Sequence, residues 1–376
     1  MKTIVNIVLI VFSATLLQAQ DFIIQNVTLF NGEDVKENVS VLVKDGVIEA
    51  VGKSIKSDVT VIDGKGKFLL PAMTNSHVHS FNKVNLEEAA QAGVLNLLDM
   101  HGVEMMQPFL KGFNDSIGYA RYYYAGYAAT APGGHGTQYG FPVPTLSTVE
   151  DAKGFVEGRI KAGAHYIKII EEPWKPTLSH DIVKAVIDAA HDNGTIAVVH
   201  ISKVADAHQV LMNNANGLVH IWWDKKISEE QLKELSQTKE FFVIPTVLTS
   251  HLALKTIRAS APEGSFLTDE EISSEVKRLY DAGVPILAGT DPPNANINYG
   301  TDLYKELVLL SKAGIPGVDV LKTATSHPAD FFKLEKVGYI KPGFKADMIL
   351  LEENPILNME NINSVETIWK EGTKVE

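Results

Sequence analysis

The order of apolar and polar residues predicts alternating strands and helices in the middle of the chain. Apolar runs of strand length occur at residues 69–76, 93–100, 120–130, 165–170, 195–200, 217–222, 241–246 and 284–291. Segments of helical periodicity lie between them. Strands that are apolar on both faces and alternate with helices form parallel sheets, and eight such units close into a barrel. The predicted fold class is α/β, with a (β/α)₈ TIM barrel over residues 71–332.

Short signals mark the starts of several helices between these runs. Serine or threonine followed three residues later by Glu or Gln is typical of the first turn of a helix. Such pairs are Ser147 with Glu150, Ser228 with Gln231 and Thr268 with Glu271. We therefore expect a helix to begin beside each pair.

The two ends of the chain have a different pattern, in which short β-type runs are broken by turns. Residues 21–70 contain such runs, with a hairpin turn at Asp45 and Gly46. Residues 333–376 again have the pattern of strands and turns. Since the first segment is incomplete as a sheet on its own, we expect one small β-sandwich domain built from both segments.

Residues 1–20, MKTIVNIVLIVFSATLLQAQ, have the pattern of a cleavable secretory signal, with Lys2 ahead of an apolar stretch. The apolar stretch is shorter than the roughly 20 residues of a membrane span, which favours cleavage over a retained membrane anchor. The chain has no cysteine, which excludes disulfides and a lipid anchor through an N-terminal cysteine. The expected location is the periplasm or the cell exterior.

Composition and charge narrow the range of partners. The chain has 376 residues, of which 45% are hydrophobic and 21% charged, so it has ample material for a globular core. Its formal net charge of −12 argues against nucleic acid and anionic membrane surfaces as partners, because both repel an acidic protein. We expect a small-molecule substrate, and the sequence leaves a homo-oligomer open.

Ligand-type side chains fall at the ends of the predicted barrel strands. They are His77 and His79 after the first run, Lys168 in the fourth, His200 at the end of the fifth, His220 in the sixth and Asp291 at the end of the eighth. In such barrels the chemistry lies at the C-terminal ends of the strands. Histidine nitrogens and carboxylate oxygens are ligands of Zn²⁺ and similar ions. The sequence therefore predicts a divalent metal site, with zinc as the expected ion.

With these motifs the chain resembles the amidohydrolase superfamily of metal-dependent hydrolases, and most of all its imidazolonepropionase-like and prolidase-like branch. The matching features are HVH after the first barrel strand, Lys168, His200, His220, AGTD around Asp291 and the segment GYIKPGFKADMILLE. The resemblance implies that His77, His79 and Asp291 hold a more buried ion and that His200 and His220 hold a more exposed one. It also implies that a carbamate on Lys168 bridges the two ions.

The implied reaction is consistent with the chemistry of these residues. Burial lowers the pKa of a lysine, and the neutral amine can add CO₂ to form a carbamate. Two ions activate a water molecule, and Asp291 serves as general base and later as general acid. The predicted function is a secreted hydrolase that cleaves a C–N amide bond by metal-activated hydroxide. Linear, cyclic, peptide-like and N-acyl amino acid amides all fit this prediction.

Other side chains are candidates for substrate contact. In related enzymes a glycine-rich segment with a histidine, here His135, supplies a hydrogen-bond donor to the substrate carbonyl. Tyr139 and Trp222 are candidates for the walls of the pocket, and Lys203 for binding a substrate carboxylate. His101 follows the second apolar run and could face the site, but a structural role is preferred and no chemical role is assigned to it. The other histidines are also assigned no chemical role, and they are His165, His180, His191, His208, His251 and His327.

Two departures from the family pattern leave alternatives open. Asn75 stands where many members have Asp, and Ile201 and Ser202 stand where prolidase-like members have a tyrosine. We expect Asn75 to change how a neighbouring ligand is oriented without abolishing metal binding. A single-ion deaminase, or a hydrolase of cyclic amidines or lactones, remains an alternative in which Lys168 is idle. A non-catalytic barrel that only binds a ligand is the alternative from another class.

Overall fold

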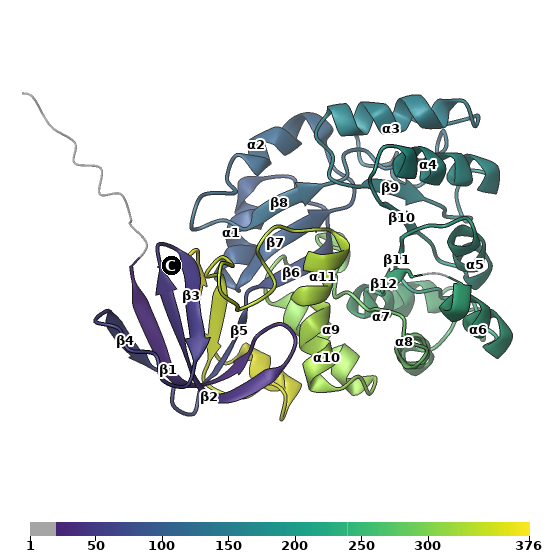
Figure 1. Ribbon diagram of the computed structural model, residues 1–376. Helices are drawn as coiled ribbons and strands as arrows, with labels where there is room; N and C mark the ends of the chain where they lie inside the picture. The colour runs from purple at the N-terminus through teal and green to yellow at the C-terminus, as the bar shows by residue number, and fades with distance from the viewer. Residues whose placement is uncertain (1–19, 239) are drawn as a thin grey trace, which may run out of the picture.

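The computed structural model describes residues 20–238 and 240–376, and Figure 1 shows their arrangement. A β-sheet built from both ends of the chain lies beside a larger α/β part. The predicted secretory signal at residues 1–20 falls almost entirely outside the described residues and stays a prediction. Within the described ranges, no helix is both long and apolar enough to cross a membrane.

Strands from both ends of the chain join in one eight-stranded sheet. Its strands are β1 (Phe22–Phe30), β2 (Val35–Lys44), β3 (Val47–Gly52), β4 (Thr60–Asp63), β5 (Phe68–Pro71), β13 (Met348–Leu351), β14 (Val365–Lys370) and β15 (Thr373–Lys374). The order is β15-β14-β13-β5-β1-β2-β3, and β4 pairs with β1. The junction between the two chain ends is the antiparallel pair of β5 and β13. The two terminal segments thus share one sheet, while the two-layer sandwich stays a prediction.

The middle of the chain contains two parallel sheets. The strands are β6 (Met73–Val78), β7 (Val94–Asp99), β8 (Arg121–Tyr124), β9 (Ile167–Ile170), β10 (Ala197–His200), β11 (Gly217–Val219) and β12 (Phe242–Ile244). They form the sheets β6-β7-β8 and β12-β11-β10-β9. Each strand overlaps one of the apolar runs, and helices separate consecutive strands along the chain, as the pattern predicted.

Further backbone contacts link the two parallel sheets on both sides. A parallel bridge between Ala129 and Ile169 joins the chain after β8 to β9. On the other side, Ile286 bridges to Val243 of β12, and the amide of Ser76 in β6 donates to the carbonyl of Ala288. The run at residues 284–291 therefore lies where an eighth strand was expected. It forms a single bridge to β12, and its amide at Ala288 bonds to the carbonyl of Thr323 outside the sheets.

Helices surround these strands (Figure 1). The α-helices are α1 (Lys83–Gln91), α2 (Gln107–Lys111), α3 (Asp151–Lys161), α4 (His180–Asp192), α5 (Val204–Met212), α6 (Glu229–Thr238), α7 (Val247–Arg258), α8 (Asp269–Asp281), α9 (Asp302–Lys312), α10 (Gly317–Thr323) and α11 (Ser326–Phe331). Short 3₁₀ helices are η1 (Glu104–Met106), η2 (Asn294–Asn296) and η3 (Met359–Asn363).

The helix-start signals can be compared with the observed first turns. Thr268 and Glu271 form the expected reciprocal pair at the start of α8, and Ser228 and Gln231 do the same before α6. The start expected beside Ser147 is wrong, because α3 begins only at Asp151. The carboxylate of Asp151 itself accepts the amides of Ser147 and Thr148, and this holds the preceding turn outside the helix.

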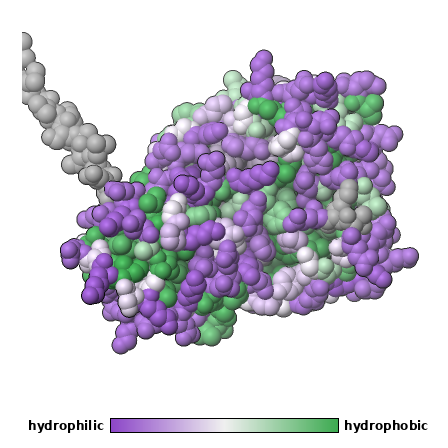
Figure 2. All heavy atoms as spheres, in the orientation of Figure 1, coloured by the Kyte–Doolittle hydropathy of each residue, from purple (hydrophilic) through white to green (hydrophobic). Residues whose placement is uncertain are grey.

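Buried ionic contacts fix the terminal sheet to the α/β part. The guanidinium of Arg121, at the start of β8, lies 2.5 Å from a carboxylate oxygen of Asp347 and 2.6 Å from one of Glu371. Lys370 in β14 is fully buried, and its Nζ donates to the carbonyls of Asn114, Ser116 and Tyr119 at 2.6–2.7 Å. On the surface the helices are mostly covered by hydrophilic residues, whereas hydrophobic residues gather over the terminal sheet (Figure 2).

Candidate active site

One cavity of about 240 Å³ collects all of the ligand-type residues predicted from the strand ends. They are His77 in β6, His79 just after it, Lys168 in β9, His200 at the end of β10, His220 just after β11 and Asp291 after the 284–291 run. Parallel strands end at the same edge of a sheet, so side chains at their C-terminal ends converge. The cavity therefore lies at the edge where barrel enzymes carry their chemistry.

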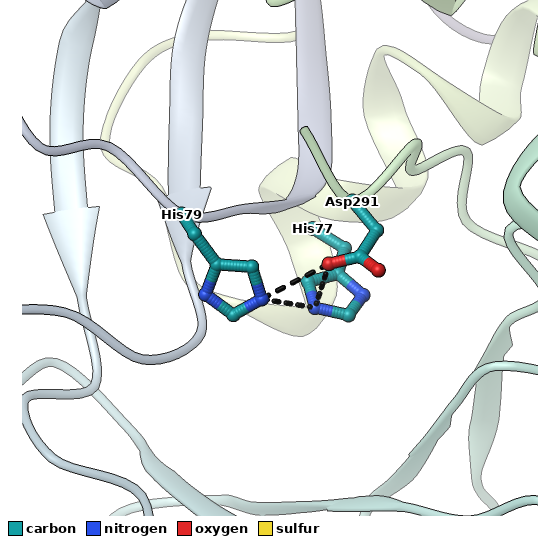
Figure 3. Close-up of side chains that lie close together, drawn as sticks. All are labelled: His77, His79 and Asp291. Atoms are coloured by element: carbon teal, nitrogen blue, oxygen red, sulfur yellow. Dashed lines mark hydrogen bonds and ion pairs between the residues drawn. The ribbon is translucent and has the colours of Figure 1, made fainter. Parts of the chain in front are cut away.

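Three of these residues form a close cluster (Figure 3). Oδ1 of Asp291 lies 3.0 Å from Nε2 of His79 and 3.3 Å from Nε2 of His77, and the two Nε2 atoms are 3.3 Å apart. These donor atoms converge closely enough to share one ion. Two imidazoles and a carboxylate form a donor set suited to a divalent transition metal.

Hydrogen bonds at the far side of the rings determine which nitrogen faces the cavity. Nδ1 of His79 lies 2.8 Å from the carbonyl oxygen of His101, which can only accept, so this nitrogen carries the proton. Nε2 of His200 lies 2.9 Å from a carboxylate oxygen of Glu172, and Nδ1 of His220 lies 2.6 Å from the hydroxyl of Thr246. With one nitrogen occupied in this way, the other nitrogen of each ring is free for a metal.

Lys168 is buried among these groups without a partner. Its side chain is 2% exposed, and Nζ has no hydrogen bond to any described residue. Burial lowers the pKa of Lys168 to about 7, although the charges of Asp291 and Asp99 act in the opposite direction. An unpaired buried amine is costly, and a neutral amine is the form that reacts with CO₂. Lys168 therefore fits a carboxylated bridging ligand.

The electrostatics of the cavity favour neutral imidazoles at most ligand positions. Burial lowers the pKa of His77, His200 and His220 well below the usual value. Burial is the largest single influence on His79 and acts the same way, but the hydrogen bond and charge of Asp291, with the charge of Asp99 and the carbonyl of His101, together raise its pKa. Neutral imidazole is the form that binds metals.

Asn75 holds the first strand against the 284–291 run. Its side-chain oxygen accepts the amides of His77 at 3.2 Å and Thr290 at 3.1 Å, while its Nδ2 donates to the hydroxyl of Thr290 at 2.7 Å. A carboxylate at this position would lack that N–H donor. The amide therefore positions the backbones that carry His77 and Asp291, and it does not point to loss of the site.

His135 and Tyr139 both line the cavity, on the loop after β8. The His135 ring packs 5.0 Å from the His200 ring and 5.6 Å from the Trp174 ring, measured between centroids, and burial lowers its pKa. Tyr139 is 39% exposed at the mouth. These positions allow contact between both side chains and a bound substrate.

Two of the expected substrate contacts are wrong. Trp222 is fully buried, and its indole N–H donates to Glu275 at 2.9 Å, so it belongs to the core. Its neighbour Trp223 lines the cavity instead. Lys203 is exposed just before α5 and is not among the residues that line the cavity. The carboxylate-binding role expected for it has no support in its position.

Several lining residues were missed from the sequence, and Glu172 and His101 are two of them. Glu172 is 1% exposed, and besides His200 its carboxylate accepts the hydroxyl of Ser202 at 2.6 Å. Burial raises the pKa of Glu172 to about 7. His101, which was assigned no role, also lines the cavity, but its ring is used by the backbone of Ala128 and Gly136. His101 thus shapes the wall, while Glu172 orients a ligand.

Comparisons with known proteins identify the class. The profile of the amidohydrolase family matches residues 68–375. A 5-methylthioadenosine/S-adenosylhomocysteine deaminase of Dictyoglomus turgidum is 22% identical over 88% of this chain and 85% of its own. The crystal structure of a Xaa-Pro dipeptidase with bound methionine matches with a TM-score of 0.80 at 21% identity, covering 95% of this chain and 100% of that one. Aspergillus niger ochratoxinase matches with a TM-score of 0.77 at 20% identity, over 95% and 96% of the two chains.

The chain therefore belongs to the amidohydrolase family. It is an enzyme of that family, a hydrolase of carbon–nitrogen bonds. The family is metal-dependent, and His77, His79 and Asp291 form a donor cluster suited to an ion. The prediction of an enzyme is thereby confirmed, and the alternative of a non-catalytic barrel is not.

Proposed function

We propose that this protein hydrolyses the C–N bond of a neutral amide with a large apolar group, at a centre of two divalent ions within an eight-stranded barrel. The observation that carries the proposal is the convergence of four histidines, one aspartate and an unpartnered buried lysine on a single cavity. A single ion would need only the cluster of His77, His79 and Asp291, with water at the open position. The further nitrogen donors and Lys168 account for a second ion.

The residues fit the proposed ions. His77, His79 and Asp291 would hold one ion, and His200 and His220 the other. Lys168 would bridge them after its neutral amine forms a bond to the carbon of CO₂ and releases a proton. Bound there, zinc or a similar ion would supply a water molecule acidic enough to lose a proton near neutral pH and would polarise the substrate carbonyl.

The protein's own side chains transfer protons and position the substrate. Asp291, which touches both His77 and His79, takes the proton of the attacking water and passes it to the leaving nitrogen. His135 lies on the opposite wall beside His200, where its ring can donate to the substrate carbonyl oxygen. Glu172 keeps the His200 ring in the orientation that turns Nδ1 toward the cavity.

The lining of the cavity favours a neutral substrate. Among the described lining residues there is no arginine, and Lys168 is the only lysine. Apolar and aromatic side chains form much of the rest, including Ile170, Trp174, Trp223 and Ile257. A substrate carboxylate would find no arginine or free lysine in this wall, whereas an aromatic or aliphatic group would be buried by it.

The test uses metal-depleted protein and matched substrates. After chelation and reconstitution with Zn²⁺, we expect hydrolysis of N-acyl aromatic amino acid amides to return, and to exceed that of the matching free acids. A His77→Ala variant should lose activity, while His191→Ala, at an exposed histidine of α4, should keep it. Release of ammonia from 5′-deoxyadenosine with a single Zn²⁺ per chain, and no amide cleavage, would favour the single-ion deaminase instead.

We also propose that the protein is exported. The support is the pattern of residues 1–20, and the mature chain should begin near Gln20 or Asp21. N-terminal sequencing of protein from the native host tests this, and an intact Met1 would contradict it.

A further inference from the structure

A second group of metal-ligating side chains lies outside the cavity, between the ends of three elements. Glu171 follows β9, His180 is the first residue of α4, and Asp206 lies in the first turn of α5. One donor atom from each of these residues lies within 4.8 Å of the other two. None of the three lines the active-site cavity, because Ile170 and Glu172 face it and Glu171 between them does not.

The group contains buried carboxylate oxygens that lack partners. Glu171 is 2% exposed, and its Oε1 lies 3.0 Å from Nδ1 of His180. Its Oε2 is buried and makes no hydrogen bond to any residue in the described ranges, and the same holds for Oδ2 of Asp206. Buried carboxylate oxygens are costly unless they are hydrogen-bonded or bind a cation. Two such oxygens in one group therefore point to a missing ligand.

The charges of the group support a cationic ligand. Burial, together with the charge of Asp206, raises the pKa of Glu171 to about 8. Burial also raises the pKa of Asp206, against the opposing charges of Lys203 and His180. Both carboxylates are thus disfavoured in their ionised forms, and a shared dication would stabilise those forms. Lys203 is exposed, so its amine is not the cation that the group would bind.

We propose that Glu171, His180 and Asp206 bind a divalent transition ion, such as Zn²⁺ or Mn²⁺, at a site separate from the catalytic cavity. One imidazole nitrogen and two carboxylates suit these ions, whereas Mg²⁺ and Ca²⁺ prefer oxygen ligands alone. His180 is 51% exposed at its side chain, which gives an ion access from solvent. Water molecules would complete the coordination on that side.

Such an ion would act on the wall of the active site. It would tie the segment from Glu171 to His180 to the start of α5. That segment includes Glu172 and Trp174, both of which line the cavity. The ion would thereby hold Glu172 against His200 and fix an aromatic part of the substrate wall, so its loss should raise KM more than it lowers kcat.

The test compares metal content in matched variants. Wild type, His180→Ala and His191→Ala are stripped with a chelator, equilibrated with the same low concentration of free Zn²⁺, and analysed for Zn²⁺ per chain by mass spectrometry. His191 lies at the other end of α4 and is exposed, so it serves as the control. We expect His180→Ala to bind one equivalent fewer than wild type and His191→Ala to bind the same number.

Further variants keep the result interpretable. Asp206→Asn, a substitution of similar size, should also lose one equivalent, and circular dichroism shows whether each variant is folded. The difference between wild type and His180→Ala does not depend on how many ions the cavity holds, so this test can fail while the proposed catalytic function stands. Equal Zn²⁺ content in wild type, folded His180→Ala and folded Asp206→Asn would overturn the proposal.

Discussion

Among the residues that the structure describes, two lysines are deeply buried, and their surroundings are opposite. Lys370, between the terminal sheet and the α/β part, donates to three backbone carbonyls. Lys168, in the cavity, has no hydrogen-bond partner among the described residues. Burial lowers the pKa of both to about 7. The shift in pKa therefore does not separate a structural lysine from a chemical one, but the number of unsatisfied donors does.

The comparison assigns a role in stability to Lys370 and a role in catalysis to Lys168. All the N–H groups of Lys370 are used to hold the segment around Asn114 to β14, so its removal should affect stability. The amine of Lys168 makes no hydrogen bond to a described residue, so removal of this side chain should affect metal binding and activity. Substitutions at and around the two sites test this division.

The largest expected effect is that of Lys168→Ala on activity. Without the bridging carbamate, the histidines and Asp291 must hold two dications that repel each other a few ångströms apart. We expect the loss of one metal equivalent and a fall in turnover of about 10³ or more, typical of losing a group essential to the metal-activated nucleophile. Metal analysis and steady-state kinetics measure both.

A small carboxylate supplies the control for this variant. Acetate or propionate can enter the space left by the side chain and bridge the ions, so activity should rise more with carboxylate and Zn²⁺ together than with Zn²⁺ alone. Full metal content and activity in Lys168→Ala without rescue would mean that the site is mononuclear or that Lys168 is structural.

Asp291→Asn should have the next largest effect. The amide oxygen can still coordinate an ion, but the side chain can no longer accept and return a proton. Turnover should fall by about 10² or more, as for loss of a general acid or base, while most of the metal remains. Unchanged turnover on an accepted substrate would remove Asp291 from the mechanism.

Lys370→Met tests the structural lysine. The substitution keeps most of the apolar stem but leaves the carbonyls of Asn114, Ser116 and Tyr119 without a donor. Each buried unpaired group costs about 1 kcal/mol or more, so the free energy of unfolding should fall by about 3 kcal/mol. Urea unfolding measures this, with kcat of the folded protein expected to stay at the wild-type level. A large loss of kcat at unchanged stability would reverse the assignment.

Glu172→Ala should give the smallest of these effects. The His200 ring would lose the carboxylate that orients it, and loss of such a partner typically costs about 10-fold in metal affinity or activity. Glu172→Gln retains an oxygen that accepts from Nε2 of His200, so it should recover most of the loss. Equal defects in the Ala and Gln variants would show that the charge of Glu172, and not its hydrogen bond, is what matters.

The strand ends were predictable because period-two alternation and strand position together determine where a side chain points. This reasoning located His77, His200 and Lys168, and the resemblance to the family added their roles. The same alternation would have found Glu172, since Lys168, Ile170 and Glu172 are spaced by two residues and all line the cavity. The signal was present in the sequence, but the last apolar residue was taken as the end of the relevant strand.

The error at Trp222 could not have been avoided by alternation. His220 has a left-handed backbone with φ of 70°, a conformation that residues other than glycine rarely adopt. It interrupts the regular strand geometry directly after β11, so Trp222 turns into the core and Trp223 reaches the cavity. Asp291 has φ of 59° and marks a similar break after Thr290. Local backbone strain at functional positions depends on tertiary contacts that the residue pattern does not contain.

The pairing of β5 with β13 has a consequence for how the chain is made on the ribosome. Until residues 348–351 have emerged, β5 has β1 on one side and an open edge on the other. Arg121 meanwhile lacks both Asp347 and Glu371. An open strand edge is a template for pairing with other chains. Once β5 has formed, the nascent protein would therefore expose an edge that can aggregate until β13 is made. Covering of this edge is therefore completed only when the last part of the chain has been made.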